Sequence, residues 1–298
     1  MNSVLQAEGQ GPKPGAAGAP KGAHPAGDIF GRFAAYVEAE IGVRLAPSKR
    51  MMVAGRLRRR MVELGYATLE DYMRHLFRDG ALDAERTEIF DAVTTNKTDF
   101  FREPSHFAHL TAEALPQAIA RRGGTHRPVK MWSAAASTGA EAWTMAICAG
   151  EYARAAGAFA WAILATDINT RVIGTARRAI YSDQILAPVP PELRARWTMQ
   201  GQGAQIGHAR IVPELRRHVR FEQLNLLDDN YALDHDIDIV FLRNVLIYFS
   251  AEDQARIVER VANHIVPGGV LYLGHSESMI AQSPTLAQIA PATFRRVV

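Results

Sequence analysis

The sequence predicts an α/β protein in which a mostly parallel sheet carries helices on both faces and an all-helical unit precedes it. From residue 129 onward, short apolar strands alternate with helical patterns, and such alternation is typical of parallel-rich sheets. Residues 28–93 show only the three- and four-residue apolar spacing of amphipathic helices. A chain of 298 residues is long enough to give each unit its own hydrophobic core.

The composition predicts a globular protein of the cytoplasm. Hydrophobic residues make up 48% of the chain and charged residues 22%, as is usual for soluble domains. The longest apolar stretch, 155–165, is shorter than the roughly 20 residues that cross a bilayer, and residues 1–27 contain no apolar core for a signal peptide. The single cysteine, Cys148, excludes an internal disulfide and a multi-cysteine metal site. Its helical, apolar surroundings predict a buried structural thiol.

The N-terminal part divides into a tail and a helical unit. Residues 1–27 are rich in Gly, Ala and Pro, and we expect this tail to be disordered. The first helix carries an apolar stripe that starts at Phe30 and stops before Gly42, a glycine C-cap. A second helix is expected to begin at Ser48, as its N-cap, and to end at Gly65. Two further helical patterns cover residues 69–77 and 81–93.

The second helix is strongly basic. No acidic residue occurs between positions 41 and 62, where six basic residues crowd together: Lys49, Arg50, Arg56, Arg58, Arg59 and Arg60. Three of them, Lys49, Arg56 and Arg60, share one helical face, which predicts a basic surface for an acidic partner. A merely solvated face is one alternative. DNA binding is another, but no helix-turn-helix or stacking aromatic residues accompany the patch.

The α/β part is expected to span residues 94–298. The predicted strands are 129–134, 159–166, 237–242, 269–274 and an edge strand at 294–298, and the predicted helices are 141–153, 170–179 and 251–265. Residues 182–220 interrupt this alternation with several prolines and a glycine-rich run. Because the segment is too long for a plain loop in a compact fold, we expect an inserted subdomain of short strands.

Polar residues gather where the predicted strands end, which is where open parallel sheets bind ligands. The first strand leads into a run of small residues that ends at Glu141, and the second ends at Asp167. An acidic residue there suits the ribose hydroxyls of a nucleoside, although it also suits a helix N-cap. Arg243, Asn244 and Tyr248 follow the strand at 237–242. The histidines are scattered without ligand spacing, so we expect no metal.

Taken in order, these segments resemble the CheR family of chemotaxis receptor methyltransferases. The matching runs are TTNKTDFFRE (94–103), WSAAASTGAE (132–141), ATDIN (165–169), NLL (225–227), FLRNVLIYF (241–249), PGG (267–269) and GHSES (274–278). The resemblance covers residues 28–298. It implies a Rossmann-like class I methyltransferase domain that uses S-adenosylmethionine, an N-terminal helical domain (28–93) that docks on the receptor, and a small antiparallel β-subdomain within 182–220 that holds receptor tails.

The resemblance also implies a set of site residues. By motif, the cofactor site comprises Asn96, Thr98, Arg102, Glu141, Asp167, Asn225, Leu226, Arg243 and Asn244. Ala140 and Ala142 depart from the family, which often has Glu and Pro there; this change is expected to loosen the turn without removing Glu141. The receptor-docking residues are Lys49, Arg56, Arg59 and Arg60.

The implied reaction is a displacement at a sulfonium methyl group by a glutamate carboxylate of the receptor. That carboxylate has an ordinary pKa near ~4.3 and is already ionised, so no general base is required. Orientation is then the main catalytic contribution, and we assign it to Arg102 and Tyr248. Two alternatives stay open: a same-fold methyltransferase for a small molecule or RNA, and a non-catalytic adapter that binds cofactor and receptor.

Overall fold

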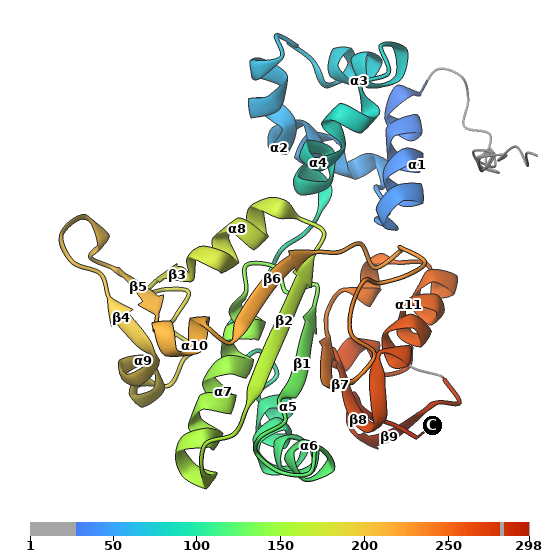
Figure 1. Ribbon diagram of the computed structural model, residues 1–298. Coiled ribbons are helices and arrows are strands. Elements are labelled where there is room, and N and C mark those ends of the chain that lie inside the picture. The colour runs from blue at the N-terminus through green and yellow to red at the C-terminus, as the bar shows by residue number, and fades with distance from the viewer. Residues whose placement is uncertain (1–27, 281–282, 298) are drawn as a thin grey trace, which may run out of the picture.

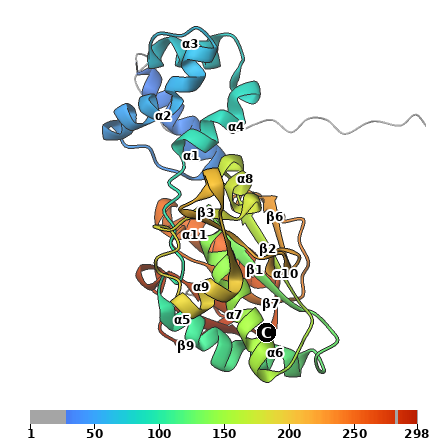
Figure 2. The same ribbon diagram turned by 90° about the vertical axis from the view of Figure 1, so that its left-hand side faces the viewer.

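The computed structural model describes residues 28–280 and 283–297. The predicted tail (1–27) and the last residue of the predicted edge strand lie outside these ranges. A helical unit sits on top of an α/β part, above the ends of its central strands, and the two views agree on this arrangement (Figures 1 and 2). No helix within the described ranges has the length and apolar character needed to span a membrane.

The helical unit contains four helices around one core. They are α1 (Ile29–Ile41), α2 (Arg50–Glu63), α3 (Leu69–Arg78) and α4 (Leu82–Val93). The predicted apolar stripes meet in this core, where Phe33, Val53 and Leu76 have no exposed surface. The expected amphipathic helices are therefore confirmed, and their burial supplies the hydrophobic stabilisation of the unit.

Most helix ends follow the predicted signals, with one exception. Gly42 ends α1 at a φ of 71°, and Thr68 caps α3 by accepting a hydrogen bond from the N–H of Asp71. The expected N-cap at Ser48 is wrong: this residue lies inside a 3-10 turn, Pro47–Lys49, and α2 begins at Arg50 without a side-chain cap. Proline fixes its own φ in the helical range, so Pro47 starts the turn before Ser48 can cap anything.

The α/β part holds the remaining elements. Its helices are α5 (Pro104–His109), α6 (Leu115–Arg121), α7 (Ala140–Ala156), α8 (Thr170–Arg178), α9 (Pro191–Trp197), α10 (Pro213–Arg216) and α11 (Ala251–Asn263). Its strands are β1 (Val129–Ala134), β2 (Trp161–Asp167), β3 (Ile180–Ser182), β4 (Thr198–Gln200), β5 (His208–Ile211), β6 (Val219–Gln223), β7 (Ile237–Leu242), β8 (Ile265–Leu273), β9 (Leu286–Ala290) and β10 (Thr293–Arg296).

The large sheet has the strand order β6-β2-β1-β7-β8-β10-β9. The first five strands are parallel, and β10 runs antiparallel to both of its neighbours. Ala134 pairs with Thr166 on one side and with Leu242 on the other. The carboxyl ends of β1, β2 and β7 are therefore level, and the residues that follow them lie close together.

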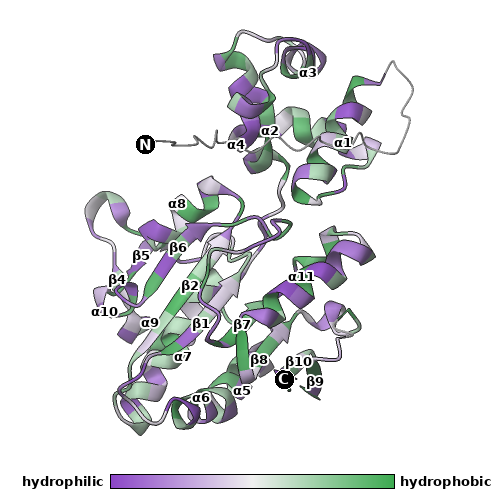
Figure 3. Cartoon of the chain, turned by 45° about the vertical axis from the view of Figure 1, so that its right-hand side comes forward, coloured by the Kyte–Doolittle hydropathy of each residue, from purple (hydrophilic) through white to green (hydrophobic). Residues whose placement is uncertain are grey.

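The sheet has a hydrophobic core on each face. On β1, Met131 packs in the cluster that includes α5, α6 and α7, while Trp132 packs in the cluster that includes α11. Such alternation is the two-residue period of a strand. Along α11, purple and green alternate in Figure 3 because its inner side carries Ile257, Val258 and Val261. The predicted buried thiol is confirmed: Cys148 is 7% exposed, and burial raises its pKa to about 12.

Several boundaries differ from the prediction. The helix expected over 251–265 ends at Asn263, and β8 begins at Ile265, four residues before the strand expected at 269–274. The C-terminal strand β10 lies inside the sheet, and the edge strand is β9, which was not predicted because its three central residues are exposed and it contains no buried apolar run. The inserted subdomain is confirmed as an antiparallel sheet of order β3-β5-β4. However, its first strand begins at Ile180, and residues 219–220 belong to β6 of the large sheet.

Candidate active site

A pocket opens at the carboxyl ends of the central strands, where the helical unit faces the sheet. Ile41 and Val43 line it from the helical side. All ten residues that the resemblance assigned to cofactor or catalysis also line it: Asn96, Thr98, Arg102, Glu141, Asp167, Asn225, Leu226, Arg243, Asn244 and Tyr248. Segments up to about 150 positions apart in the sequence therefore meet here, as expected for the switch region of an open α/β sheet.

The turn between β1 and α7 forms one wall of this pocket. Ala135 and Ser137 hold left-handed φ angles of 59° and 52°, a conformation that non-glycine residues adopt at a cost and that concentrates at functional sites. The N–H of Ser137 donates to Oδ2 of Asp167 at 2.8 Å, and its hydroxyl donates to the carbonyl of Asn96 at 2.8 Å. Ser137 thus connects the segments that carry Asn96 and Asp167.

Asp167 is a buried acceptor at the end of β2. It is 7% exposed, and its Oδ1 accepts a hydrogen bond from the N–H of Asn169 at 2.9 Å. Burial raises its pKa to about 6, although backbone hydrogen bonds act in the opposite direction. Asn169, not Asp167, is the N-cap of α8, with its side chain accepting from the N–H groups of Arg171 and Val172. The N-cap alternative for Asp167 is therefore wrong.

Arg243 holds the inner end of the pocket together. Its side chain is 1% exposed and lies 3.0 Å from Oε2 of Glu103 and 3.1 Å from Oε2 of Glu141. Glu141 also accepts a hydrogen bond from the hydroxyl of Ser133 at 2.7 Å. Burial raises the pKa of Glu141, and the charge of Arg243 limits that rise. Most of the hydrogen-bonding capacity of Arg243 is thus used within the protein.

Arg102 differs from Arg243 in that its guanidinium is nearly uncommitted. Within the described ranges, its single recorded hydrogen bond is a long one of 3.5 Å to the carbonyl of Lys97. It lies half-buried between two residues with left-handed φ angles, Phe101 (52°) and Glu103 (56°). These two conformations set the direction of the Arg102 backbone. Arg102 is therefore a cation at the pocket with free donors.

Tyr248 lies on a short turn that a buried carboxylate supports. Glu277 has no exposed surface, and its Oε2 accepts from the N–H of Asn244 at 2.7 Å and of Gly274 at 2.9 Å. Its Oε1 accepts from the N–H of Ile247, one residue before Tyr248, at 3.3 Å. A Cβ atom on Gly274 would lie 2.7 Å from the Glu277 carboxylate, so glycine is required there. Burial raises the pKa of Glu277.

The helical unit is part of the pocket and is fastened to the sheet domain. Asn225 donates to the carbonyl of Glu40 in α1 at 2.8 Å. Asp91 in α4 accepts from the N–H and the hydroxyl of Thr170 at 2.7 and 2.8 Å, at the start of α8. These contacts lie beside Leu226 and Asp167, so the position of the helical unit and the shape of the pocket depend on each other.

Several basic side chains of helix α2 form contacts within the protein, which the sequence alone does not reveal. Arg56 donates to the carbonyls of Ala92 and Thr94, and Arg60 forms a pair of hydrogen bonds with Glu85, which is 3% exposed. Arg59 is the most exposed of the ion-paired arginines on this helix, with 88% of its side chain accessible. Lys49 is also exposed. Arg59 and Lys49 therefore carry their positive charge at the protein surface.

Sequence reasoning assigned no role to Glu103 or Glu277. Both stand inside motifs that were recognised, at the ends of the runs 94–103 and 274–278. Their partners come from distant segments: Arg243 lies 140 positions from Glu103, and Asn244 lies 33 positions from Glu277. Local patterns cannot reveal such contacts. Nor could they reveal that His106 and His275 lie next to each other, with ring centroids 4.9 Å apart, despite their separation in the sequence.

Comparison with known proteins gives a consistent family. Residues 28–94 match the family domain described as "CheR methyltransferase, all-alpha domain", and residues 96–295 match "CheR methyltransferase, SAM binding domain". The chain is 37% identical to chemotaxis protein methyltransferase 2 of Pseudomonas aeruginosa, over 85% of this chain and 87% of that protein. It is 38% identical to the chemotaxis protein methyltransferase of Salmonella typhimurium, over 84% of this chain and 83% of that protein, and 36% identical to that of Escherichia coli, over 84% of each.

The pocket fits the cofactor that this family uses. S-Adenosylmethionine carries ribose hydroxyls, an adenine ring and an amino-acid carboxylate. The buried carboxylate of Asp167 offers acceptors, Leu226 offers an apolar surface, and the uncommitted guanidinium of Arg102 offers donors. The chain is accordingly an S-adenosylmethionine-dependent methyltransferase. Its two family domains together cover nearly the whole of the described structure, and this protein belongs to the CheR family of chemotaxis methyltransferases.

Proposed function

We propose that this enzyme methylates glutamate side chains in the cytoplasmic domain of a chemotaxis receptor, and that it does so in the cytoplasm. The observation that carries the proposal is that one pocket is lined by all ten of the residues that the family resemblance assigned. Relatives named as chemotaxis protein methyltransferases support the chemotaxis role. The receptor and its glutamates come from the family resemblance.

Within this proposal, residues from three segments hold the cofactor. Asp167 accepts hydrogen bonds from the ribose hydroxyls with the lone pairs that Ser137 and Asn169 leave free. Leu226, 6% exposed, packs against the adenine, and the Asn225 backbone flanks it, because the Asn225 side chain is bound to Glu40 and Leu227. Asn96 and Thr98 complete the wall opposite. Arg243 and Glu141 act by keeping this frame in place.

The chemistry needs orientation more than proton transfer. Bound S-adenosylmethionine supplies an electrophilic methyl group on sulfur. The free guanidinium of Arg102 binds a carboxylate with its planar set of donors, and Tyr248 lines the same pocket. We assign to these two residues the alignment of the incoming glutamate. A closed pocket also removes water from that carboxylate, which strengthens each electrostatic contact.

The basic helix α2 supplies the docking surface for the acidic receptor in this proposal. Lys49 and Arg59 act directly, since their side chains reach solvent. Arg56 and Arg60 act mainly by holding α2 against α4. Fully exposed Met51 and Val62 on the same helix, at 80% and 70%, add apolar contact area.

The small antiparallel sheet is proposed to hold a receptor C-terminal peptide. Among the residues that the structure describes, strand β4 pairs only with β5, so its other edge offers backbone groups without a strand partner. Exposed edge strands bind extended peptides by adding a strand. Met199 in β4 and Ile206 in the connection to β5, 43% and 76% exposed, give a partner side chain an apolar contact.

A transfer assay tests the proposal. The enzyme is incubated with methyl-labelled S-adenosylmethionine and a receptor cytoplasmic fragment, with and without its C-terminal tail. We expect label on the receptor that is released by mild base, as methyl esters are, and a lower rate without the tail. Base-stable label indicates methylation of nitrogen and contradicts the glutamate assignment. Cofactor binding without any transfer indicates a non-catalytic adapter.

A further inference from the structure

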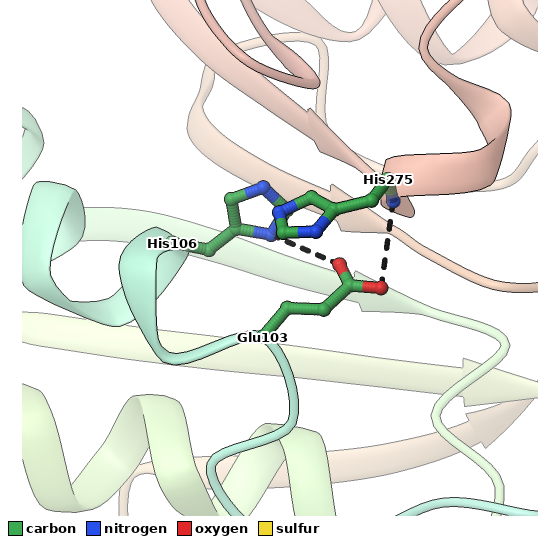
Figure 4. A group of neighbouring side chains, drawn as sticks. All are labelled: Glu103, His106 and His275. Carbon is green, nitrogen blue, oxygen red and sulfur yellow. Dashed lines mark hydrogen bonds and ion pairs between the residues drawn. The ribbon is translucent and has the colours of Figure 1, made fainter.

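A cluster of three ligand-type side chains lies next to the pocket but does not line it. Glu103 stands at the N-terminus of α5, His106 lies one turn later, and His275 follows β8 (Figure 4). Their ligand atoms all lie within 4.8 Å of one another. Nδ1 of His106 is 3.5 Å from Oε2 of Glu103, and the backbone N–H of His275 donates to Oε1 at 3.4 Å.

His106 is the unusual member of this cluster. It is 2% exposed, and neither ring nitrogen has a hydrogen-bond partner of normal geometry in the described structure, although a contact with the Pro291 backbone acts to raise its pKa. Buried polar groups without partners are costly and rare in native proteins. Burial, and then the charge of Arg243, lower the pKa of His106 to about 4. The buried imidazole therefore has hydrogen-bonding capacity that the protein does not use.

The other two members suit the same ligand. Burial raises the pKa of Glu103, but hydrogen bonds and charge from Arg243 outweigh it, so the net shift is downward and the carboxylate is ionised. His275 is exposed, and it borders a shallow groove that Ser278 and residues 288–292 complete. An ion from solvent thus reaches the cluster along this groove without passing through the cofactor pocket.

We propose, against the expectation from sequence spacing that the chain binds no metal, that Glu103, His106 and His275 form a binding site for one divalent transition-metal ion of the zinc type. Two imidazole nitrogens and one carboxylate oxygen are ligands that Zn²⁺, Ni²⁺ or Fe²⁺ prefer, whereas Mg²⁺ and Ca²⁺ prefer oxygen alone. Three protein ligands leave a position for water. The ion gives His106 a full partner, where the protein itself offers the ring only the contacts with Glu103 and the Pro291 backbone.

The nearby Arg243 opposes a second positive charge but does not prevent it. Arg243 is shared between two carboxylates, Glu103 and Glu141, at 3.0 and 3.1 Å. When the ion takes one lone pair of Glu103, the guanidinium keeps its contact with Glu141. Because Glu103 also touches Asn244 and precedes α5 directly after Arg102, an ion here stiffens the segment that carries Arg102.

Calorimetric titration of the full chain with zinc chloride tests this site. The protein carries no histidine tag and is first freed of metal with a chelator. We expect binding of one equivalent, and His275→Gln is expected to weaken it at least about tenfold, since even outer-shell partners of a metal ligand contribute that much. His208→Gln, which removes another exposed histidine from strand β5, is the matched control and should bind as the original protein does.

Co²⁺ provides a second measurement, because its visible absorption reports the donor atoms and geometry around the ion. The original protein and His208→Gln should give the same ligand-field bands, and His275→Gln should lose them. Absence of saturable Zn²⁺ binding by the original protein overturns the site, as does equal affinity in His275→Gln. S-Adenosylhomocysteine binding by the metal-free protein is measured in parallel, so that failure of the metal site is distinguished from failure of the methyltransferase assignment.

Discussion

The carboxylate of Glu277 accepts a hydrogen bond from the backbone N–H of Asn244 at 2.7 Å, and Asn244 holds a left-handed φ of 56°. The same carboxylate binds the N–H groups of Gly274 and Ile247. It therefore fixes the turn between Arg243 and Tyr248 from outside the pocket, because Glu277 is not one of the residues that line the pocket. A carboxylate with no exposed surface is retained here because it satisfies three backbone donors that would otherwise be buried without partners.

Replacing Glu277 should loosen this turn and destabilise the protein. Glu277→Ala leaves three N–H groups without an acceptor, at about 1–3 kcal/mol for each that water does not reach. We expect the free energy of unfolding to fall by about 3 kcal/mol and the methylation rate to fall by more than the change in cofactor affinity explains. Denaturant unfolding, cofactor titration and initial rates measure these three quantities.

Glu277→Gln keeps the shape of the side chain but removes its carboxylate. The amide keeps one acceptor oxygen for Asn244 and Gly274, so a loss of only about 1 kcal/mol is expected. Glu259→Ala, an exposed change on α11, is the matched control and should stay within about 0.5 kcal/mol of the original protein. Full activity in Glu277→Ala would show that the turn needs no such support.

Arg102 and Tyr248 should affect the reaction in different ways. Arg102→Ala removes the free cation of the pocket, and loss of a charged hydrogen bond of about 1.5–3 kcal/mol corresponds to a fall of roughly ten- to hundredfold in kcat/KM. Arg102→Lys should restore little, because an ammonium lacks the planar pair of donors. Tyr248→Phe should lower kcat about tenfold at saturating cofactor and leave the cofactor Kd nearly unchanged.

Initial rates at saturating cofactor, with receptor fragment varied, check both variants. Arg127→Ala, an exposed arginine far from the pocket lining, serves as the control for charge removal and should behave as the original enzyme does. If Arg102→Ala and Tyr248→Phe both keep the original rates, orientation does not depend on these residues.

Cofactor binding should depend on the ionisation of Asp167. Burial raises the pKa of Asp167 to about 6 from an ordinary value of 3.8, so below pH 6 the carboxyl is mostly protonated and is a poorer acceptor for ribose hydroxyls. We expect the Kd of S-adenosylhomocysteine to increase toward about tenfold for each pH unit below 6 and to be flat above pH 7. Titrations between pH 5 and 8 measure this dependence.

The sign for stability is opposite. A carboxyl whose folded pKa lies above its unfolded value contributes most to stability below pH 4, and this contribution is lost as the pH rises toward 6. Weaker cofactor binding at pH 5 therefore does not reflect unfolding caused by Asp167. Asp167→Asn should bind the cofactor more weakly and without this pH dependence; a variant that keeps the same pH profile would assign the titration to another group.

The order of elements was predictable because each depends on a local pattern. The three- and four-residue stripes of α1 and α2 and the short apolar runs of β1 and β7 survive in the fold with shifts of only a few residues. Strand β9 was not predictable, since three of its five residues are exposed and its position depends on pairing with β10 and on the burial of Leu286 alone. The start of α2 was missed because Pro47 outweighs the capping preference of Ser48.

The sequence predicted residues of the site but not the contacts that these residues make with one another. The ten residues assigned from the motifs all line the pocket. The motifs could not show that Arg243 is occupied by Glu103 and Glu141 while Arg102 is nearly free, because those contacts depend on three separate segments. The uses of two chemically identical side chains in one pocket are set by their partners and burial, and these exist only in the folded chain.

The basic residues at α2 should fall into two groups: exposed residues that contact the receptor, and residues that stabilise the helical unit. Lys49→Glu combined with Arg59→Glu changes only exposed charge, so we expect normal unfolding, normal cofactor affinity, a higher KM for the receptor fragment and a weaker dependence of KM on salt, since surface attractions are screened by ions. Arg60→Glu instead breaks the pair with Glu85, which is 3% exposed. Because Arg60 itself is partly exposed, we expect a loss of about 2–3 kcal/mol in the free energy of unfolding. Receptor methylation at varied salt and denaturant unfolding, measured on the same variants, test this separation. An unchanged receptor KM in the Lys49/Arg59 variant would show that the basic helix does not contact the receptor. If Arg60→Glu is as stable as the original protein, Arg60 has no structural role and is free to contact the receptor directly.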